Sequence, residues 1–136
     1  MPSSSYKRRL ALALMLVLLA ASSSGCGGSA NVAPVKGRVT LDGSPLENAL
    51  VQFSPGGVGA PSSGRTNAQG EYELTYTEDV KGAVIGNHVV RVTTYQSGDP
   101  DADPPRPEVA ERVPEKYAAG IPKEVKPGAN VINIEL

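Results

Sequence analysis

The sequence predicts an all-β domain, an antiparallel β-sandwich of six to seven strands, after an N-terminal signal peptide. From residue 34 onward, apolar residues recur at every second position in short runs, as in half-buried strands, and turn-forming residues separate the runs. No window shows the 3.6-residue apolar period of an amphipathic helix. About 110 residues remain after the leader, enough for one domain with one hydrophobic core.

Residues 1–25 have the three parts of a signal peptide. Basic residues at positions 7–9 precede an unbroken apolar run over residues 10–21, and small residues lead from there to position 25. The apolar run is too short for a membrane-spanning helix, which needs about 20 residues. Arg8 and Arg9 are also compatible with a twin-arginine export signal. The residues after them match that motif poorly, so an ordinary basic start is predicted.

Cys26 is the only cysteine and directly follows this leader. Together with Ser24 and Gly25 it resembles the lipobox of bacterial lipoproteins, although Ser23 stands where an apolar residue is usual. The resemblance implies cleavage before Cys26 and a diacylglyceryl group on its sulfur, which with further acylation anchors a chain stably to a membrane. The alternative is ordinary cleavage within residues 20–24, which leaves a free thiol. Because an unpaired cysteine in an exported chain needs an explanation, lipidation of Cys26 is predicted.

The predicted organisation is a lipoprotein signal peptide (1–25), a flexible tether (26–33) and one sandwich domain (34–136). The predicted location is the cell envelope, with the membrane as a partner through the lipid. Without the leader's three basic residues, 10 basic residues face 14 acidic ones, a net charge of −4. Lys and Arg are scattered singly, whereas nucleic-acid binding depends on clustered basic residues. Nucleic acid is therefore excluded as a partner.

The first predicted strand covers residues 35–41, with Val35, Val39 and Leu41 on its inner face. Asp42-Gly43 follows, a strong signal for a tight turn, and Leu46 is expected to lie beneath it. A second strand then places Ala49, Val51 and Phe53 inward. Residues 54–64 are rich in Gly, Pro and Ser and are predicted to be a loop.

The next strand follows a turn in which Asn67 and Gly70 supply the special backbone conformation. Its inward residues are expected to be Tyr72, Leu74 and Tyr76. Residues 86–94 alternate again, with His88, Val90 and Val92 on one side. Residues 100–107 hold four prolines and cannot be strand interior. After a strand fragment at 124–126 and a turn at 127–130, residues 131–136 are expected to turn Ile132, Ile134 and Leu136 toward the core.

Three segments resemble the transthyretin-like, carboxypeptidase regulatory-like domains. Residues 39–53 resemble their opening strand, Asp-Gly-x-Pro-Leu turn and Ala-x-Val-x-Phe strand. Residues 66–74 are similar to their Thr-Asn-x-x-Gly-x-Tyr-x-Leu signature, and residues 86–92 to the strand after it. Small bacterial lipoproteins of this kind have a tail similar to residues 115–117 and 126–130. The resemblance implies a transthyretin/prealbumin-like sandwich that serves as a non-catalytic accessory or surface module.

The residues that could take part in catalysis do not form the pattern of any enzyme site. His88 is the only histidine, so the chain can form no histidine cluster for zinc, and its inward position favours a packed structural residue. A hydroxyisourate hydrolase of the transthyretin-like fold works through several histidines, which this chain lacks. Neither a nucleophile elbow nor a phosphate-binding glycine loop is present. No catalytic residue, cofactor or metal site is predicted.

Two segments resemble known sites, a calcium loop and an isopeptide bond, and each is weighed against a simpler interpretation. Asp99, Asp101 and Asp103 alternate as in a calcium loop, but the glycine and glutamate of an EF-hand are replaced by Pro104 and Ala110. A solvated surface loop is therefore predicted there, with weak calcium binding as the alternative. Some related sandwiches contain a Lys–Asn isopeptide bond, but Lys36 is expected to face outward, so none is predicted.

The predicted function is that of a lipid-anchored structural or protein-interaction module. It would bind an unknown envelope protein along a strand edge or through its loops. The alternative is a carbohydrate-binding module of the cell envelope. Sugar sites usually stack on exposed aromatic rings, and only Tyr95 and Tyr117 are plausible platforms in a chain without Trp.

Overall fold

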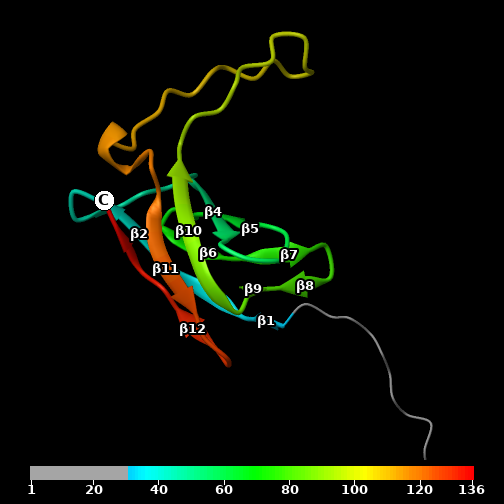
Figure 1. Cartoon of the computed structure of the whole chain (residues 1–136). Helices are drawn as coiled ribbons and strands as arrows, with labels where there is room; N and C mark the ends of the chain where they lie inside the picture. The colour runs from blue at the N-terminus through cyan, green and yellow to red at the C-terminus, as the bar shows by residue number, and fades with distance from the viewer. Residues whose placement is uncertain (1–30) are drawn as a thin grey trace, which may run out of the picture.

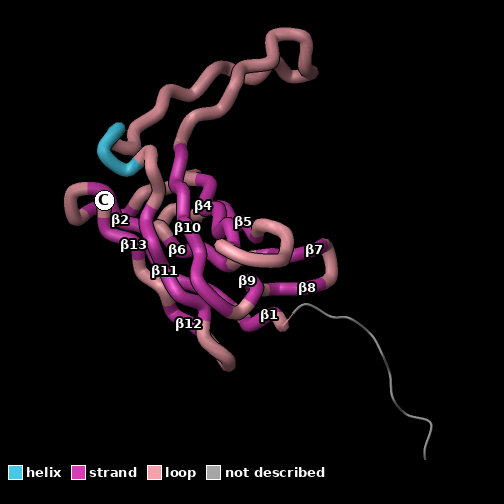
Figure 2. Tube along the Cα trace, in the orientation of Figure 1, coloured by secondary structure: helices cyan, strands magenta, loops and turns pink. Residues whose placement is uncertain are grey.

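The computed structural model describes residues 31–136 (Figures 1 and 2). Its strands are β1 (Val32–Ala33), β2 (Val35–Leu41), β3 (Ser44–Pro45), β4 (Leu50–Pro55), β5 (Ser62–Arg65), β6 (Glu71–Glu73), β7 (Thr75–Thr77), β8 (Val80–Lys81), β9 (Ala83–Val84), β10 (Gly86–Thr93), β11 (Ile121–Val125), β12 (Asn130–Val131) and β13 (Ile134–Glu135). A short 3₁₀ helix, η2 (Glu115–Tyr117), precedes β11. Within this part of the chain no helix is long and apolar enough to span a bilayer.

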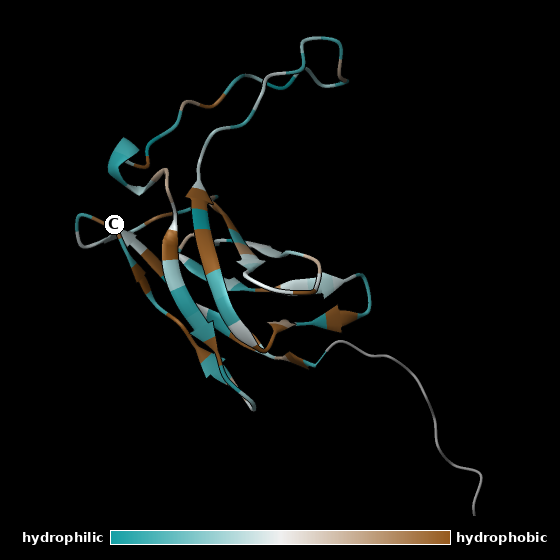
Figure 3. Cartoon of the chain, viewed as in Figure 1, coloured by the Kyte–Doolittle hydropathy of each residue, from teal (hydrophilic) through white to brown (hydrophobic). Residues whose placement is uncertain are grey.

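The strands form an all-β sandwich, which confirms the predicted fold class, although thirteen mostly short strands within residues 31–136 stand in place of the six to seven predicted. The larger sheet has the order β11-β10-β4-β5-β7-β8, and its strands pair antiparallel. The smaller sheet is built around β2, which pairs with β3, β6, β12 and β13. A two-stranded ladder of β1 and β9 completes the fold. In Figure 3 the apolar residues alternate with polar ones along the longer strands, as expected for strands with one buried face.

The core residues of the longer strands are those that the alternation predicts, whereas Tyr76, also expected to face inward, is only half-buried and is not part of the core. Val35 and Val39 from β2, and Val51 and Phe53 from β4, are fully buried between the sheets. The ring of Phe53 lies 6.3 Å from the ring of Tyr72 on β6, so aromatic side chains from both sheets meet at the centre. The predicted turn is also present, because Asp42 and Gly43 both have positive φ, and Leu46 is buried beneath it.

Three predicted features are wrong. The boundary at residue 34 lies too late, because Val32–Ala33 already pairs with β9 and Ala33 is buried. Residues 54–64 are not all loop, since β5 pairs with β4 and buries Ser62. The sandwich is not purely antiparallel, because β12 and β13 run parallel to β2. A parallel neighbour is set by long-range packing, which local alternation does not report.

A long arm, residues 94–113, connects the end of β10 to the segment that leads into η2. Figure 1 shows this arm, in yellow, projecting beyond the sandwich. Isolated bridges join Gln96 to Val109 and Asp99 to Arg106. The sequence predicted a loop at the arm's proline-rich tip, and the tip contains no strand.

Candidate functional site

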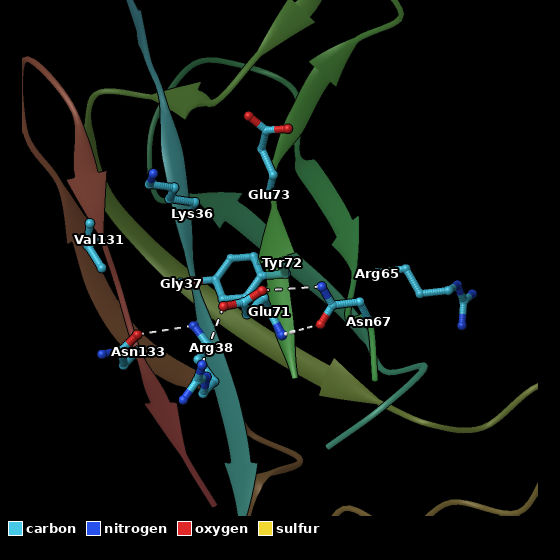
Figure 4. Close-up of a pocket in the computed structure, with 10 residues that line it drawn as sticks. All are labelled: Lys36, Gly37, Arg38, Arg65, Asn67, Glu71, Tyr72, Glu73, Val131 and Asn133. Carbon is cyan, nitrogen blue, oxygen red and sulfur yellow. Dashed lines mark hydrogen bonds and ion pairs between the residues drawn. The ribbon is translucent and has the colours of Figure 1, made fainter. Parts of the chain in front are cut away.

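A concavity lies over the smaller sheet, where β2 runs between β6 and the C-terminal strands (Figure 4). Its volume is about 640 Å³. Arg38 on β2 lies opposite Glu71 on β6, and their charged groups are 3.3 Å apart. The other carboxylate oxygen of Glu71 accepts a hydrogen bond from Asn67 at 3.4 Å. The backbone N–H of Arg38 donates to the side chain of Asn133 at 3.0 Å.

These contacts engage the side chains of Arg38, Asn67, Glu71 and Asn133, whereas the exposed ammonium group of Lys36 forms no ion pair within residues 31–136. An exposed cross-strand ion pair such as that of Arg38 with Glu71 contributes little to the stability of the fold. The one phenol beneath it belongs to Tyr72, and burial raises the pKa of that phenol. Because Tyr72 already donates to the carbonyl oxygen of Ile132 at 2.6 Å, it is held as a structural donor. The phenol of Tyr72 is therefore engaged in the fold and does not project into the groove as a free group.

The base of the arm is a second polar site, and it is fastened by Glu111. One carboxylate oxygen of Glu111 accepts hydrogen bonds from the N–H and the hydroxyl of Thr94, at 2.9 and 3.0 Å, and from the N–H of Val113 at 3.0 Å. The other oxygen accepts a hydrogen bond from the hydroxyl of Thr93. Desolvation raises the pKa of Glu111, but the hydrogen bonds outweigh it and lower the pKa to about 2. The carboxylate thus closes the arm onto the end of β10.

The tip of the arm is held by a second contact. Arg106 donates to Asp99 at 2.9 Å, and the two residues also form a backbone bridge. Asp101, Asp103 and Glu108 are exposed and form no ion pair within residues 31–136. The arm is therefore an ordered projection with unpaired carboxylates near its tip.

The structure separates the residues singled out in the sequence. His88 is buried, with Nε2 2.6 Å from the carbonyl oxygen of Val84 and its ring 5.7 Å from the ring of Phe53. This is the packed histidine that was predicted. Lys36 is exposed, also as predicted. Cys26, the predicted lipidation site, lies outside the described residues.

The three aspartates of the predicted surface loop do not converge. Asp99 is engaged by Arg106, and its other oxygen accepts a hydrogen bond from the N–H of Asp101 at 3.3 Å. Among the residues that the structure describes, no group of three or more side chains of the metal-binding types is assembled. The arrangement gives no support to the calcium alternative.

The two tyrosines proposed as sugar platforms differ in exposure. Tyr95, at the base of the arm, is 49% exposed. Tyr117 packs partly against the core, and the ammonium group of Lys116 lies 4.8 Å from the centre of its ring. Tyr95 therefore presents an open ring, whereas Tyr117 is partly covered. Sequence reasoning missed the role of Glu111, because its partners Thr93 and Thr94 lie 18 and 17 residues away along the chain.

Comparisons with known proteins add little to this description. No family model and no curated protein matches the chain. Among solved structures, one similar chain is that of a DUF3823 family protein from Parabacteroides merdae ATCC 43184, with a TM-score of 0.41 and 19% sequence identity. The similarity covers 79% of this chain and 46% of the other, so this chain spans less than half the length of that protein. The fold assignment rests on the strand pairing described above.

Proposed function

We propose that this chain is an exported, lipid-anchored and non-catalytic module of the cell envelope, which binds a partner protein through its arm. The sandwich itself is proposed to be of the transthyretin-like, carboxypeptidase regulatory-like kind, on the motifs quoted above. The leader and Cys26 support the export and the anchor. Because β1 begins at Val32, only five residues separate the proposed anchor from the fold.

The observation that carries the interaction role is the order of the arm. Glu111 fixes its base, and backbone bridges from Gln96 to Val109 and from Asp99 to Arg106 join its two sides, so its conformation is set before a partner arrives. A preordered loop loses less conformational entropy on binding than a mobile one. Long ordered loops on a rigid scaffold are also where binding residues concentrate.

The charge of the arm indicates the chemistry of the partner. Asp101, Asp103 and Glu108 are exposed and unpaired within the described part of the chain. A basic protein surface complements them, and such contacts raise the association rate and weaken with salt. The proposed partner is therefore an envelope protein with a basic patch.

A non-catalytic role is supported by the placement of the titratable groups. His88 is buried against Val84 and Phe53, and the groove of Figure 4 holds ion-paired and hydrogen-bonded side chains. Neither location offers an open position beside a base for a reacting atom. No cofactor is invoked in this proposal.

Carbohydrate binding is the second candidate, and the exposed ring of Tyr95 is the one observation that favours it. A glycan array with the Tyr95→Ala variant as control tests it. Loss of a specific glycan signal in the variant would favour this candidate over protein binding. The absence of any glycan signal above that of the variant would eliminate it.

Photo-crosslinking in the native envelope tests the proposed role of the arm. A photoreactive amino acid in place of Tyr95 should yield one discrete protein adduct, and the same replacement at Val131, on the far C-terminal strand, should not. The double variant Asp101→Asn, Asp103→Asn should weaken the adduct severalfold, and added salt should weaken it similarly. An adduct of equal yield from both positions, or one insensitive to both changes, contradicts the proposal.

A further inference from the structure

The chain enters the fold at one end of the sandwich. β1 pairs with β9, and the N–H of Ile85 donates to the carbonyl oxygen of Asn31 at 2.8 Å. Val32 lies six positions after Cys26, and a fully extended chain of that length spans at most about 20 Å. If Cys26 carries the proposed lipid, the end that contains β1, β8 and β9 must stay close to the membrane. We call it the entry end.

The entry end also displays two apolar side chains. Val58 is 97% exposed in the loop between β4 and β5. Its neighbour Gly59 lies against β9, since a Cβ there would be 2.7 Å from a methyl group of Val84. Val80 on β8 is 41% exposed. Both valines therefore lie near β1, where the chain enters the fold.

Both signs of charge surround these valines, with a slight acidic excess because Glu124 is also exposed near the end of β11. Glu78 and Asp79 form the turn between β7 and β8, whereas Lys81 follows on β8. Lys126 is exposed just after β11, whose last residue is paired with the first residue of β10. A surface with both signs around an apolar contact suits zwitterionic lipid headgroups better than a strongly anionic layer, which Glu78 and Asp79 would oppose.

The arm lies at the other end of the molecule. β10 begins at Gly86, directly after β9, and ends at Thr93, where the arm begins. Eight residues of strand span about 25 Å. Figure 1 shows β1, β8 and β9 together at one end of the sandwich and the arm beyond the opposite end.

We propose that the entry end rests on a zwitterionic lipid surface through Val58 and Val80, so that the arm points away from the membrane. This inference rests on the proposed lipid anchor. It adds an orientation, because a tether alone would allow the domain to tumble. A fixed orientation keeps the arm available to a partner beyond the lipid surface.

Environment-sensitive labels test this orientation in the lipidated full-length mature protein. In that protein the sulfur of Cys26 is blocked, so one introduced cysteine can be labelled alone. The variants are Val58→Cys and, as a matched valine on the arm, Val109→Cys, which is 36% exposed. Each is reconstituted in vesicles of phosphatidylethanolamine and phosphatidylcholine that contain a headgroup-level quencher.

The label at position 58 should shift to shorter emission wavelength and be quenched severalfold more than the label at position 109. Adding Val58→Asp to a protein labelled at Val80→Cys should reduce the quenching of that label. Equal quenching at positions 58 and 109, or stronger quenching at 109, overturns the proposed orientation. Intact mass of the same samples separates the two proposals. If the lipid is present and position 58 remains solvent-exposed, only the orientation fails; if position 26 carries no lipid in protein from the native envelope, the anchor itself fails.

Discussion

Tyr72 lies directly opposite Gly37 in the register of β6 and β2, and its side chain passes over that glycine to the segment between β12 and β13. The phenol donates to the carbonyl oxygen of Ile132 at 2.6 Å. A Cβ at position 37 would overlap the same carbonyl and lie 3.1 Å from the tyrosine ring. The missing side chain of Gly37 thus lets β6 and this segment approach β2 closely.

Gly37→Ala should destabilise the domain. The added methyl group meets backbone rather than a movable side chain, so the C-terminal strands must shift, at a cost of about 3 kcal/mol. Urea unfolding monitored by circular dichroism measures this cost. Gly57→Ala is the matched control, because a Cβ there has no neighbour within 4 Å. A similar loss in both variants would contradict the close approach described here.

Tyr72→Phe should cost about 1–2 kcal/mol in the free energy of unfolding, since it leaves the Ile132 carbonyl without this donor while the ring still packs against Phe53. Tyr95→Phe, which removes an exposed phenol, should change stability by less than about 0.5 kcal/mol. The same denaturation assay compares the two. Equal stabilities of the two variants would show that the hydrogen bond contributes nothing.

Glu111→Gln should loosen the arm without unfolding the sandwich. The carboxylate accepts hydrogen bonds from Thr94 and Val113, and a neutral amide replaces them with weaker ones. Exchange of the Thr94 and Val113 amide hydrogens should therefore become about tenfold faster. Glu108→Gln, at an exposed arm position, is the control and should leave these rates unchanged. Unaltered exchange rates in Glu111→Gln would contradict the role of Glu111 in holding the base of the arm.

Glu111 should also titrate at unusually low pH. Its pKa in the folded protein is lowered from 4.5 to about 2, so the folded state favours the ionised form. The stabilisation is fully present above pH 4.5 and is lost as the pH falls toward 2. NMR titration of the side-chain carboxyl carbon measures the pKa directly. A midpoint near 4.5 would contradict the hydrogen-bond network at the base of the arm.

The sequence was most informative where structure depends on neighbours along the chain. Alternation predicted the inward faces of β2, β4 and β10, and Asp42-Gly43 predicted the turn, because strand parity and turn chemistry are local. β5 was missed because a segment of Ser and Gly lacks apolar alternation, even though Ser62 is buried. The parallel pairing of β12 and β13 with β2 joins residues about 95 positions apart.

The candidate site was predictable only in part. The burial of His88 followed from its parity in the strand, and the prolines predicted the irregular tip of the arm. The role of Glu111 was not predictable, because it looks like any exposed acidic residue until the fold brings Thr93 and Thr94 to it. The contact of Tyr72 with Ile132 across Gly37 was not predictable either, because it depends on the segments that pair with both edges of β2.

The most direct test of the central proposal is the intact mass of the mature protein purified from its native envelope. We expect a chain that begins at Cys26 and exceeds the mass of residues 26–136 by a diacylglyceryl group and further acylation. Substitution Cys26→Ser should abolish this added mass and release the protein into the soluble fraction. A native protein with a free thiol at Cys26, or an unmodified chain that begins elsewhere, would contradict the account.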